Sequence, residues 1–300
     1  MAPLKLIFNK TAARVWGERA SFGLLDRPEI MRAALVIVLL VAALFRFHGL
    51  DWDNGRHLHP DERFLSSVTN DLKWPETMEA YFDPQTSTLS PYSLPNMGLY
   101  VYGTLPVYIV KWMAIQLGRN DYDAITLLGR ALSGLFDLGT ILFVFLIGRR
   151  LYNAKIGLLA AALLSLSVLN IQLSHFYTVD TFASFFVLAT IYVMLHASNS
   201  GRWPLFALAG VLFGLGLASK VSVATLGVPI VLGIALTLAR RLREGQDVGQ
   251  ALEQTLVRTL TVFGIALLVF RIVQPIAFAG PGFWNWSLNP RWLRDIDEQR

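Results

Sequence analysis

Ionisable side chains are densest between residues 51 and 96, where eight carboxylates stand against three lysines or arginines. The adjacent carboxylates Asp61 and Glu62 can act as a general base with a supporting neighbour, or can supply oxygen ligands to a divalent cation. His57 and His59 extend the metal interpretation, because a His-x-His pair beside carboxylates can coordinate zinc or manganese. These four residues are therefore the first candidates for catalytic or metal-binding roles.

The same run also has a structural interpretation. Pro60 is suited to the first turn of a helix, and the carboxylates of Asp61 and Glu62 would favour the positive end of that helix dipole. The structural and the functional interpretation are compatible with each other.

Further ionisable residues lie at the ends of apolar blocks. Asp180 follows the run His175-Phe-Tyr-Thr-Val and opens an apolar block, so it is either a helix cap or a group that faces a cavity. Lys220 separates two short apolar blocks and is either a snorkelling anchor or a contact for a lipid phosphate.

Two charged residues fall inside an apolar block. Arg130 and Asp137 are seven positions apart and lie near one helical face, about two turns from each other. Arg130, near the outer end, is a candidate for binding phosphate. Asp137 is expected to accept hydrogen bonds between helices.

The composition requires a membrane. Hydrophobic residues make up 54% of the 300 residues, charged residues make up 16%, and the mean hydropathy is +0.48. Apolar residues gather in blocks close to the roughly 20 residues that a spanning helix needs, and in lipid such blocks must be helical. The absence of cysteine excludes disulfides and thiolate zinc sites. The basic residues cluster at block ends and not on one extended face, which argues against a nucleic-acid partner.

The apolar blocks predict an all-α integral membrane protein of about seven spans. Block 97–118 contains Pro106, Lys111 and several tyrosines, so we expect it to lie at the interface within an external loop over 51–124. The organisation is then a cytoplasmic segment 1–30, a transmembrane module 31–279 and an external Trp-rich tail 280–300. The predicted spans are 31–50, 125–148, 156–173, 179–197, 204–219, 221–239 and 255–279.

Orientation follows from the positive-inside rule. Three basic clusters are expected to be cytoplasmic, which places Asp61, His175, Asp180 and Lys220 together on the outer face of the plasma (inner) membrane. The clusters are Lys5, Lys10, Arg14, Arg19, Arg27 and Arg32; Arg149, Arg150 and Lys155; and Arg240, Arg241 and Arg243.

The order of these features resembles the GT-C-fold glycosyltransferases of the protein O-mannosyltransferase and lipid A aminoarabinose transferase type. The resemblance covers roughly residues 30–235. It rests on His59-Pro-Asp-Glu-Arg-Phe64 after the first span, an interfacial segment, Arg130-Ala-Leu-Ser133, Gly148-Arg-Arg-Leu-Tyr152 and the Asp180 turn.

The resemblance implies transfer of a sugar from a polyprenyl-phosphate carrier to an acceptor hydroxyl on a protein, lipid or glycan. It implies that Asp61 is the catalytic base, that Glu62 supports it and that Asp180 is the second acidic residue. The predicted contacts for the carrier phosphate are Arg63, Arg130, Lys220 and His175, which stands where relatives often carry arginine. A cation held by Asp61, Glu62, His57 and His59 would be magnesium or manganese in preference to zinc.

Two other classes of protein remain open on the sequence. A secondary transporter could line a polar path with Asp137, Arg130 and Asp180, although no internal repeat is evident. A non-catalytic scaffold could use the acidic loop only to bind a partner or a cation. Neither the sugar nor the acceptor is specified by the sequence.

Overall fold

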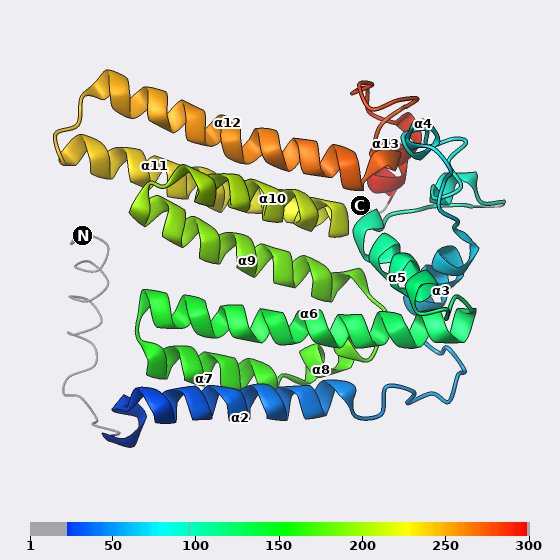
Figure 1. Cartoon of the computed structure of the whole chain (residues 1–300), viewed down its shortest axis with the longest axis horizontal. Helices are drawn as coiled ribbons and strands as arrows, with labels where there is room; N and C mark the ends of the chain where they lie inside the picture. The colour runs from blue at the N-terminus through cyan, green and yellow to red at the C-terminus, as the bar shows by residue number, and fades with distance from the viewer. Residues whose placement is uncertain (1–22, 96, 299–300) are drawn as a thin grey trace.

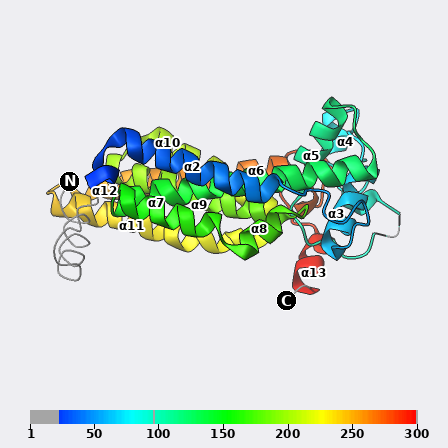
Figure 2. The same ribbon diagram turned by 90° about the horizontal axis from the view of Figure 1, so that it is seen from below.

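The computed structural model describes residues 23–95 and 97–298, and within them the chain is helical apart from turns and one isolated bridge between Phe278 and Leu288. Long helices run side by side along the longest axis, and a group of short helices sits at one end of them (Figures 1 and 2). We call that end, which carries α3 (Pro60–Asp71) and α5 (Thr104–Gln116), the site end. The opposite end is the arginine end.

Five helices are long and apolar enough to cross a membrane, and the pair α7 (Ala154–Ser165) and α8 (Val168–Ser174) is a sixth candidate, bent by 60°. Helix α10 (Trp203–Ser219) is apolar but shorter. The multi-pass all-α prediction is confirmed, but of the seven predicted spans five, or six with the bent pair, have the length and composition of a membrane-spanning helix. The five long segments are α2 (Pro28–Phe47), α6 (Tyr122–Leu151), α9 (Val179–Ser200), Val221–Arg243 comprising η3 (Val221–Leu226) and α11 (Gly227–Arg243), and α12 (Val248–Val273).

The predicted span 156–173 is wrong as a continuous helix, because the chain breaks between Ser165 and Val168. Arg46, fully buried on α2, donates to the carbonyls of Leu164 and Ser165 at 3.4 and 2.9 Å. Its Nε lies 2.6 Å from the Asp137 carboxylate, which also accepts from Asn170. Arg46 thus supplies hydrogen bonds to carbonyls beside the break, and the Asp137 carboxylate balances its buried charge.

Helix α5 is the structural counterpart of the predicted interfacial block 97–118. Its 13 residues span only about 20 Å, which is less than the roughly 30 Å of a bilayer core. It lies at the site end beside α3 and across the ends of the long helices (Figure 1). The prediction that this block does not form a spanning helix agrees with the structure.

Side-chain caps fix where the helices that carry candidate residues begin. His59 precedes α3, and its Nδ1 accepts a hydrogen bond from the Glu62 N–H. Asp121 caps α6 through the Ala124 N–H, and Thr178 caps α9 through the Asp180 N–H. Because each cap satisfies an otherwise unpaired backbone group, the sequence specifies the starting points of α3, α6 and α9.

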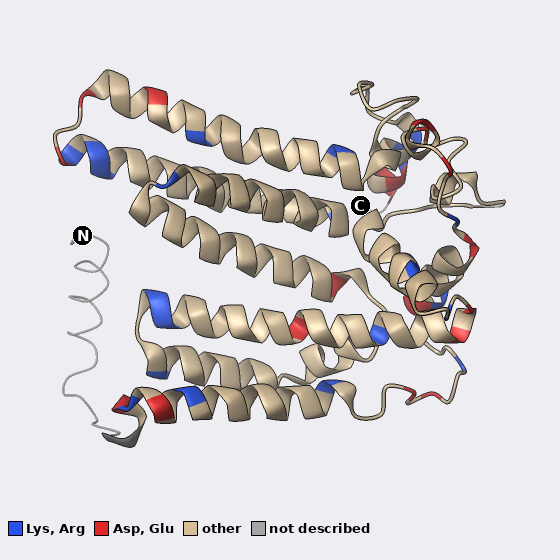
Figure 3. Cartoon of the chain, viewed as in Figure 1, with Lys and Arg blue, Asp and Glu red and all other residues tan. Residues whose placement is uncertain are grey.

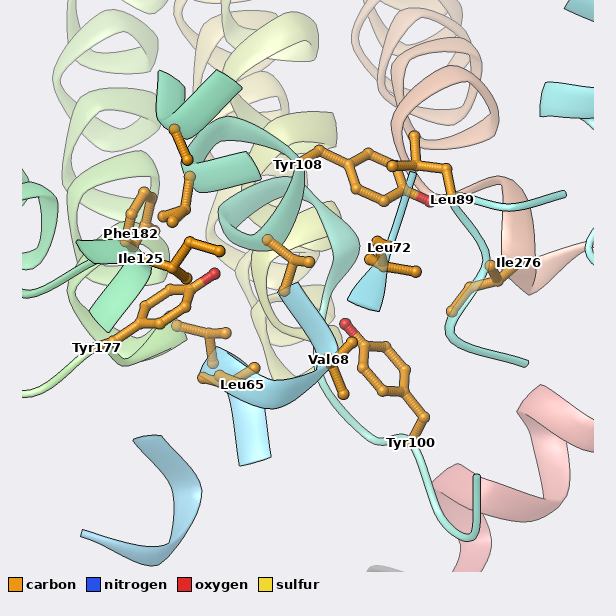
Figure 4. Packing of buried hydrophobic residues seen from close by; sticks show 14 of the residues in the cluster. Leu65, Val68, Leu72, Leu89, Tyr100, Tyr108, Ile125, Tyr177, Phe182 and Ile276 are labelled. Carbon is orange, nitrogen blue, oxygen red and sulfur yellow. The ribbon is translucent and has the colours of Figure 1, made fainter. Parts of the chain in front are cut away.

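A hydrophobic core joins the short helices to the bundle. Leu65, Val68 and Leu72 project from one face of α3 and pack with buried residues of α5, α6, α9 and the chain near Ile276 (Figure 4). Tyr100 and Tyr177 are the largest aromatic side chains that are fully buried in this core. Burial of one α3 face leaves the opposite face, with Asp61, at the surface.

The C-terminal region folds back onto the site end. Arg271, fully buried near the end of α12, donates to the carbonyls of Gly282 and Phe283 at 2.6 and 3.0 Å. Helix α13 (Pro290–Glu298) follows, and its Asp295 accepts a hydrogen bond from the Tyr100 N–H. The described part of the predicted Trp-rich tail, residues 280–298, therefore packs against the site end, with Trp284 exposed.

Basic clusters that were predicted to share one side do lie at one end. Arg149 and Arg150 close α6, while Arg240, Arg241 and Arg243 close α11, both at the arginine end (Figure 3). Lys155 forms an ion pair with Asp26 just before α2. Lys5, Lys10, Arg14 and Arg19 lie outside the described residues.

Candidate active site at one end of the helix bundle

The first turn of α3 separates the two predicted catalytic carboxylates. Asp61 is exposed, whereas Glu62, one position further along the helix, is fully buried. Adjacent residues on a helix point about 100° apart, so packing of one α3 face into the core forces this division. The Asp61 side chain can therefore contact a ligand, whereas the Glu62 side chain is buried in the protein interior.

Glu62 is held by Arg130, which is also buried. Arg130 Nε and Nη2 donate to the two Glu62 oxygens at 2.8 and 2.7 Å, and Arg130 Nη2 also contacts Asp53 at 2.9 Å. Glu62 accepts a further bond, of 2.8 Å, from the Tyr177 N–H. One network therefore joins α3, α6, the turn before α3 and the turn before α9.

Asp53 completes this network from the turn before α3. Burial alone would raise the pKa of its carboxyl, but hydrogen bonds from Arg130 and the Leu58 N–H, with the Arg130 charge, bring the pKa below its usual range. The turn is tight, since Asn54 and His57 adopt positive φ angles of 51° and 50°. The Asp53–Arg130 contact holds this strained turn in place.

Acid should weaken this network. Because the pKa of Asp53 is lower in the folded chain, its stabilising contribution is present above the unfolded pKa of about 3.9 and is lost as pH falls through the folded value. We expect the unfolding temperature to fall less steeply between about pH 6 and 3 in Asp53→Asn than in the wild type. The exposed neighbour variant Asp51→Asn is the control, and equal slopes in all three proteins would contradict this assignment.

Asp180 and Lys220 form a second charged pair at the site end. Lys220 Nζ lies 2.5 Å from Asp180 Oδ1, and both side chains are partly exposed. Asp180 stands in the first turn of α9, while Lys220 follows the last residue of α10. The sequence predicted that both residues share one side of the membrane, and the structure places them in direct contact.

Tyr102 brings Asp61 and Asp180 into one site. Its hydroxyl lies close enough to the Asp61 and Asp180 carboxylates for both to act on its pKa. Burial raises the pKa of Tyr102, and the two carboxylates raise it further, so the hydroxyl remains protonated. Sequence reasoning did not identify this residue. The only signal was the run of tyrosines that marked its segment as interfacial.

Gly103 allows Tyr102 to approach the end of α10. Its N–H donates to the Ser219 carbonyl at 3.2 Å, and a Cβ atom added at Gly103 would lie 2.1 Å from the Ala218 oxygen. Only glycine fits this close backbone contact. The contact places Tyr102 beside the position from which Lys220 reaches Asp180.

A groove of about 410 Å³ opens beside the Asp180–Lys220 pair. Ser184, Ser222 and Thr225 add hydroxyl groups to its wall. Its remaining lining is apolar and comes from α9, η3 and α11, through Ala183, Val187, Val223, Leu226 and Pro229. The groove therefore combines a charged mouth with an apolar wall between helices.

Arg63 and His175 are the other predicted phosphate contacts, and they differ in whether their side chains can reach a ligand. Arg63 is exposed on α3 close to Tyr122. His175 is turned inward, with Nδ1 2.8 Å from the Ile171 carbonyl oxygen and Nε2 2.9 Å from that of His48. His175 thus joins the end of α8 to the end of α2.

The predicted metal ligands are not brought together. His57 Nε2 contacts Asp123 at 2.7 Å, and the His59 ring stacks on Phe176. Glu62 forms an ion pair with Arg130, so Asp61 is the only one of the four predicted metal ligands that is exposed without such a partner. Among residues 23–95 and 97–298, no three histidine or acidic side chains form a group that could hold a metal ion. These side chains, as arranged, do not fit the predicted cation.

The polar path of the transporter hypothesis is not continuous. Arg130 is hydrogen-bonded to Glu62 and Asp53, and Asp137 is hydrogen-bonded to Arg46 and Asn170, so neither side chain is available to a transported substrate. Both networks are almost fully buried, and the groove beside Asp180 is lined by neither. The expectation that Asp137 accepts hydrogen bonds between helices is confirmed, although the sequence did not identify Arg46 as its partner.

Comparison with known proteins gives one profile match over part of the chain and several structures of similar fold. Residues 110–252 match the profile of the dolichyl-phosphate-mannose-protein mannosyltransferases. The His59–Phe64 run lies before the matched residues. No curated protein sequence matches the chain.

Solved structures share the arrangement of helices. The S. cerevisiae protein O-mannosyltransferase Pmt1-Pmt2 complex bound to the sugar donor is similar with a TM-score of 0.62 and 15% identity, over 83% of this chain and 34% of that chain. The Archaeoglobus fulgidus oligosaccharyltransferase in complex with Zn and sulfate gives a TM-score of 0.59 and 18% identity, over 88% of this chain and 34% of that one.

A structure of the archaeal oligosaccharyltransferase AglB from A. fulgidus, with an inhibitory peptide and a dolichol-phosphate, gives a TM-score of 0.59 at 18% identity over 89% of this chain. The chain spans about a third of the length of each of these structures. At such identities the similarity establishes the GT-C-like fold alone. The comparisons thus show a GT-C-like fold for the chain and a match of residues 110–252 to the dolichyl-phosphate-mannose-protein mannosyltransferase profile.

Proposed function

We propose that the chain transfers a sugar from a polyprenyl-phosphate carrier to an acceptor hydroxyl, at the site end of the bundle. The observation that supports this most strongly is the position of Asp61, an exposed carboxylate near Tyr102, whose pKa both Asp61 and the Lys220-paired Asp180 raise. A base and a cation are thereby placed in one site beside a groove with an apolar wall.

Asp61 is the proposed general base. Its carboxylate takes the proton of the acceptor hydroxyl while the acceptor oxygen forms a bond to the anomeric carbon of the sugar. The bond between that carbon and the phosphate oxygen breaks, and its electron pair leaves with the polyprenyl phosphate. This single displacement inverts the anomeric centre. The Tyr102 hydroxyl orients the Asp61 carboxylate.

Lys220 is the proposed partner of the leaving phosphate. Negative charge grows on that group as the bond breaks, and a cation placed there stabilises the transition state more than the ground state. Asp180 holds the Lys220 side chain at the mouth of the groove, and the apolar wall receives the beginning of the prenyl chain. Arg63 is the second, more exposed candidate for this phosphate.

Three predicted site residues take positioning roles in this proposal. Glu62 and Arg130 fix the first turn of α3 against α6, and thereby the direction of Asp61. His175 fixes the turn that leads to Asp180. Arg130 is not a phosphate contact here, because Glu62, Asp53 and the Leu50 carbonyl take its donors inside the protein.

The site end is proposed to face the outside of the cell membrane. The support is the gathering of Arg149, Arg150, Arg240, Arg241 and Arg243 at the opposite end, which the positive-inside rule assigns to the cytoplasm. A carrier flipped to the outer leaflet would then present its sugar to an acceptor on a secreted protein, lipid or glycan.

Removing the Lys220 charge should impair use of the donor. We expect Lys220→Gln to lower kcat/KM for the polyprenyl-phosphate sugar by about 10- to 100-fold, as loss of a charge-assisted hydrogen bond would. The control is Lys73→Gln, an exposed lysine just after α3. Initial rates at varied donor concentration measure the effect, and wild-type kinetics in Lys220→Gln would remove Lys220 from the mechanism.

The proposal is tested by supplying radiolabelled sugars to the wild-type chain in proteoliposomes, on polyprenyl-phosphate carriers and, as a control, on nucleotides. We expect label to move to an acceptor only from the lipid carrier, with release of one polyprenyl phosphate for each sugar transferred. Transfer from nucleotide sugars alone, or no turnover of any lipid-linked sugar by the folded chain, would contradict the proposal.

A further inference from the structure

A cluster of three guanidinium groups lies at the arginine end, far from the proposed active site. Arg240 and Arg241 belong to the last turn of α11, and Arg258 belongs to α12, which packs beside it. Arg258 is buried with only 8% of its surface exposed. Blue segments of the ribbon, which mark lysine or arginine positions, lie on both helices in this part of the bundle (Figure 3).

The partners of these guanidinium groups are neutral. Arg240 Nη2 donates to the Ser198 carbonyl at 2.8 Å, and Arg258 Nη2 reaches the Gly201 carbonyl at 3.4 Å. Gln254, on α12, accepts from both Arg241 and Arg258 through one oxygen. The cluster therefore covers the C-terminal carbonyls of α9, which carry only a fraction of one negative charge.

The positive charge of the cluster is not balanced by acidic groups in the described part of the chain. The nearest carboxylate is Glu244, which is 3.9 Å from Arg240 Nε and exposed. Arg241 and Arg258 have no ion pair among residues 23–95 and 97–298, and Arg240 and Arg241 repel Arg258. Arg258 Nη1 is buried without a hydrogen-bond partner. The Arg258 guanidinium therefore has no anionic group that balances its charge in the described part of the chain.

The depth of the cluster matches a lipid headgroup. Trp203, half exposed at the start of α10, donates to Thr261 on α12, one turn from Arg258. Tryptophan is typical of the membrane–water interface. Leu256 and Leu260, on either side of Arg258 in sequence, are exposed apolar residues that would face acyl chains. A tryptophan and exposed leucines beside Arg258 are the surroundings expected of a residue at the boundary between headgroups and acyl chains.

We propose that Arg240, Arg241 and Arg258 bind the phosphate group of an anionic phospholipid at the arginine end. The planar fork of arginine matches phosphate oxygens, and a basic recess between helices at the cytoplasmic side is a recurrent site for acidic headgroups. The site is separate from the sugar-transfer site; it shares with the proposed function the cytoplasmic orientation of the arginine end and does not depend on sugar transfer.

The test uses the full chain in nanodiscs that contain phosphatidylcholine and phosphatidylglycerol, followed by native mass spectrometry of the lipids it retains. We expect preferential retention of phosphatidylglycerol. Arg241→Gln should weaken that retention about fivefold, which corresponds to the roughly 1 kcal/mol that one arginine contributes to anionic lipid attraction. Arg258→Lys, which keeps the charge but loses the fork, should weaken it without unfolding the chain.

The matched control is Arg150→Gln, which removes an exposed arginine from the same end of the bundle but outside the cluster. It should leave phosphatidylglycerol retention unchanged. Equal retention of both lipids by the wild type, or an equal loss in Arg150→Gln and Arg241→Gln, would overturn the proposal. Displacement of the lipid by inorganic phosphate alone would show a site for small anions in place of a lipid site.

Discussion

Replacement of Arg130 by glutamine is expected to lower the free energy of unfolding by about 3–5 kcal/mol and to abolish sugar transfer. The change leaves the buried carboxylates of Glu62 and Asp53 without their cation, and both lie in the protein interior. It also releases the first turn of α3 from α6, so Asp61 loses its fixed direction. Thermal unfolding of the purified chain in one detergent measures the stability change.

Two variants make the Arg130 test specific. Arg130→Lys keeps the charge but cannot reproduce the paired bonds to Glu62, so it should recover only part of the stability. Arg63→Gln removes an exposed arginine of α3 and should leave the unfolding temperature close to that of the wild type. An Arg130→Gln protein as stable as Arg63→Gln would show that the buried network does not hold this end together.

Replacement of Asp61 by asparagine is expected to lower kcat for transfer by about 10²- to 10⁴-fold, the usual contribution of a general base. The amide keeps the size of the side chain but cannot accept a proton from the acceptor hydroxyl. Asp61 is exposed and has no ion-pair partner in the described part of the chain, so the fold should be unaffected. Initial rates with saturating donor measure the effect.

Asp71→Asn is the matched control for this substitution. It makes the same chemical change at the other end of α3, on an exposed residue remote from Tyr102. It should transfer sugar at the wild-type rate. If both variants lost activity to the same degree, the loss would reflect the charge of the acidic region and not proton transfer by Asp61.

The membrane architecture was predictable because lipid imposes a simple rule on sequence. Apolar blocks of sufficient length must form helices, so α2, α6, α9 and α12 appear directly in the hydropathy pattern. The break between α7 and α8 was not predictable in this way. It depends on Arg46, which lies more than a hundred positions earlier in the chain and provides the hydrogen bonds that the break requires.

Part of the candidate site was also predictable. Alternating spans placed Asp61, Asp180 and Lys220 on one side of the membrane, and the structure brings them to one end of the bundle. Tyr102 escaped prediction because its role depends on a backbone contact between Gly103 and Ser219, which joins segments more than a hundred residues apart. No local pattern encodes that contact.

The pairing of Glu62 with Arg130 was hidden for a different reason. Sequence reasoning treated each residue as a separate group facing a ligand, since an acidic pair and a membrane arginine are both typical of functional sites. The core on one face of α3 turns Glu62 inward, where only a buried cation can compensate its charge. The same packing turns Asp61 outward.

We assign different roles to Asp61 and Glu62, proton transfer to the first and support of the fold to the second. The decisive experiment measures both the unfolding temperature and the transfer rate on the same samples of Asp61→Asn and Glu62→Gln. We expect Asp61→Asn to keep the wild-type unfolding temperature and to lose sugar-transfer activity, whereas Glu62→Gln should unfold at a clearly lower temperature. A folded Asp61→Asn protein that transfers sugar at the wild-type rate would contradict the account, as would a Glu62→Gln protein of undiminished stability.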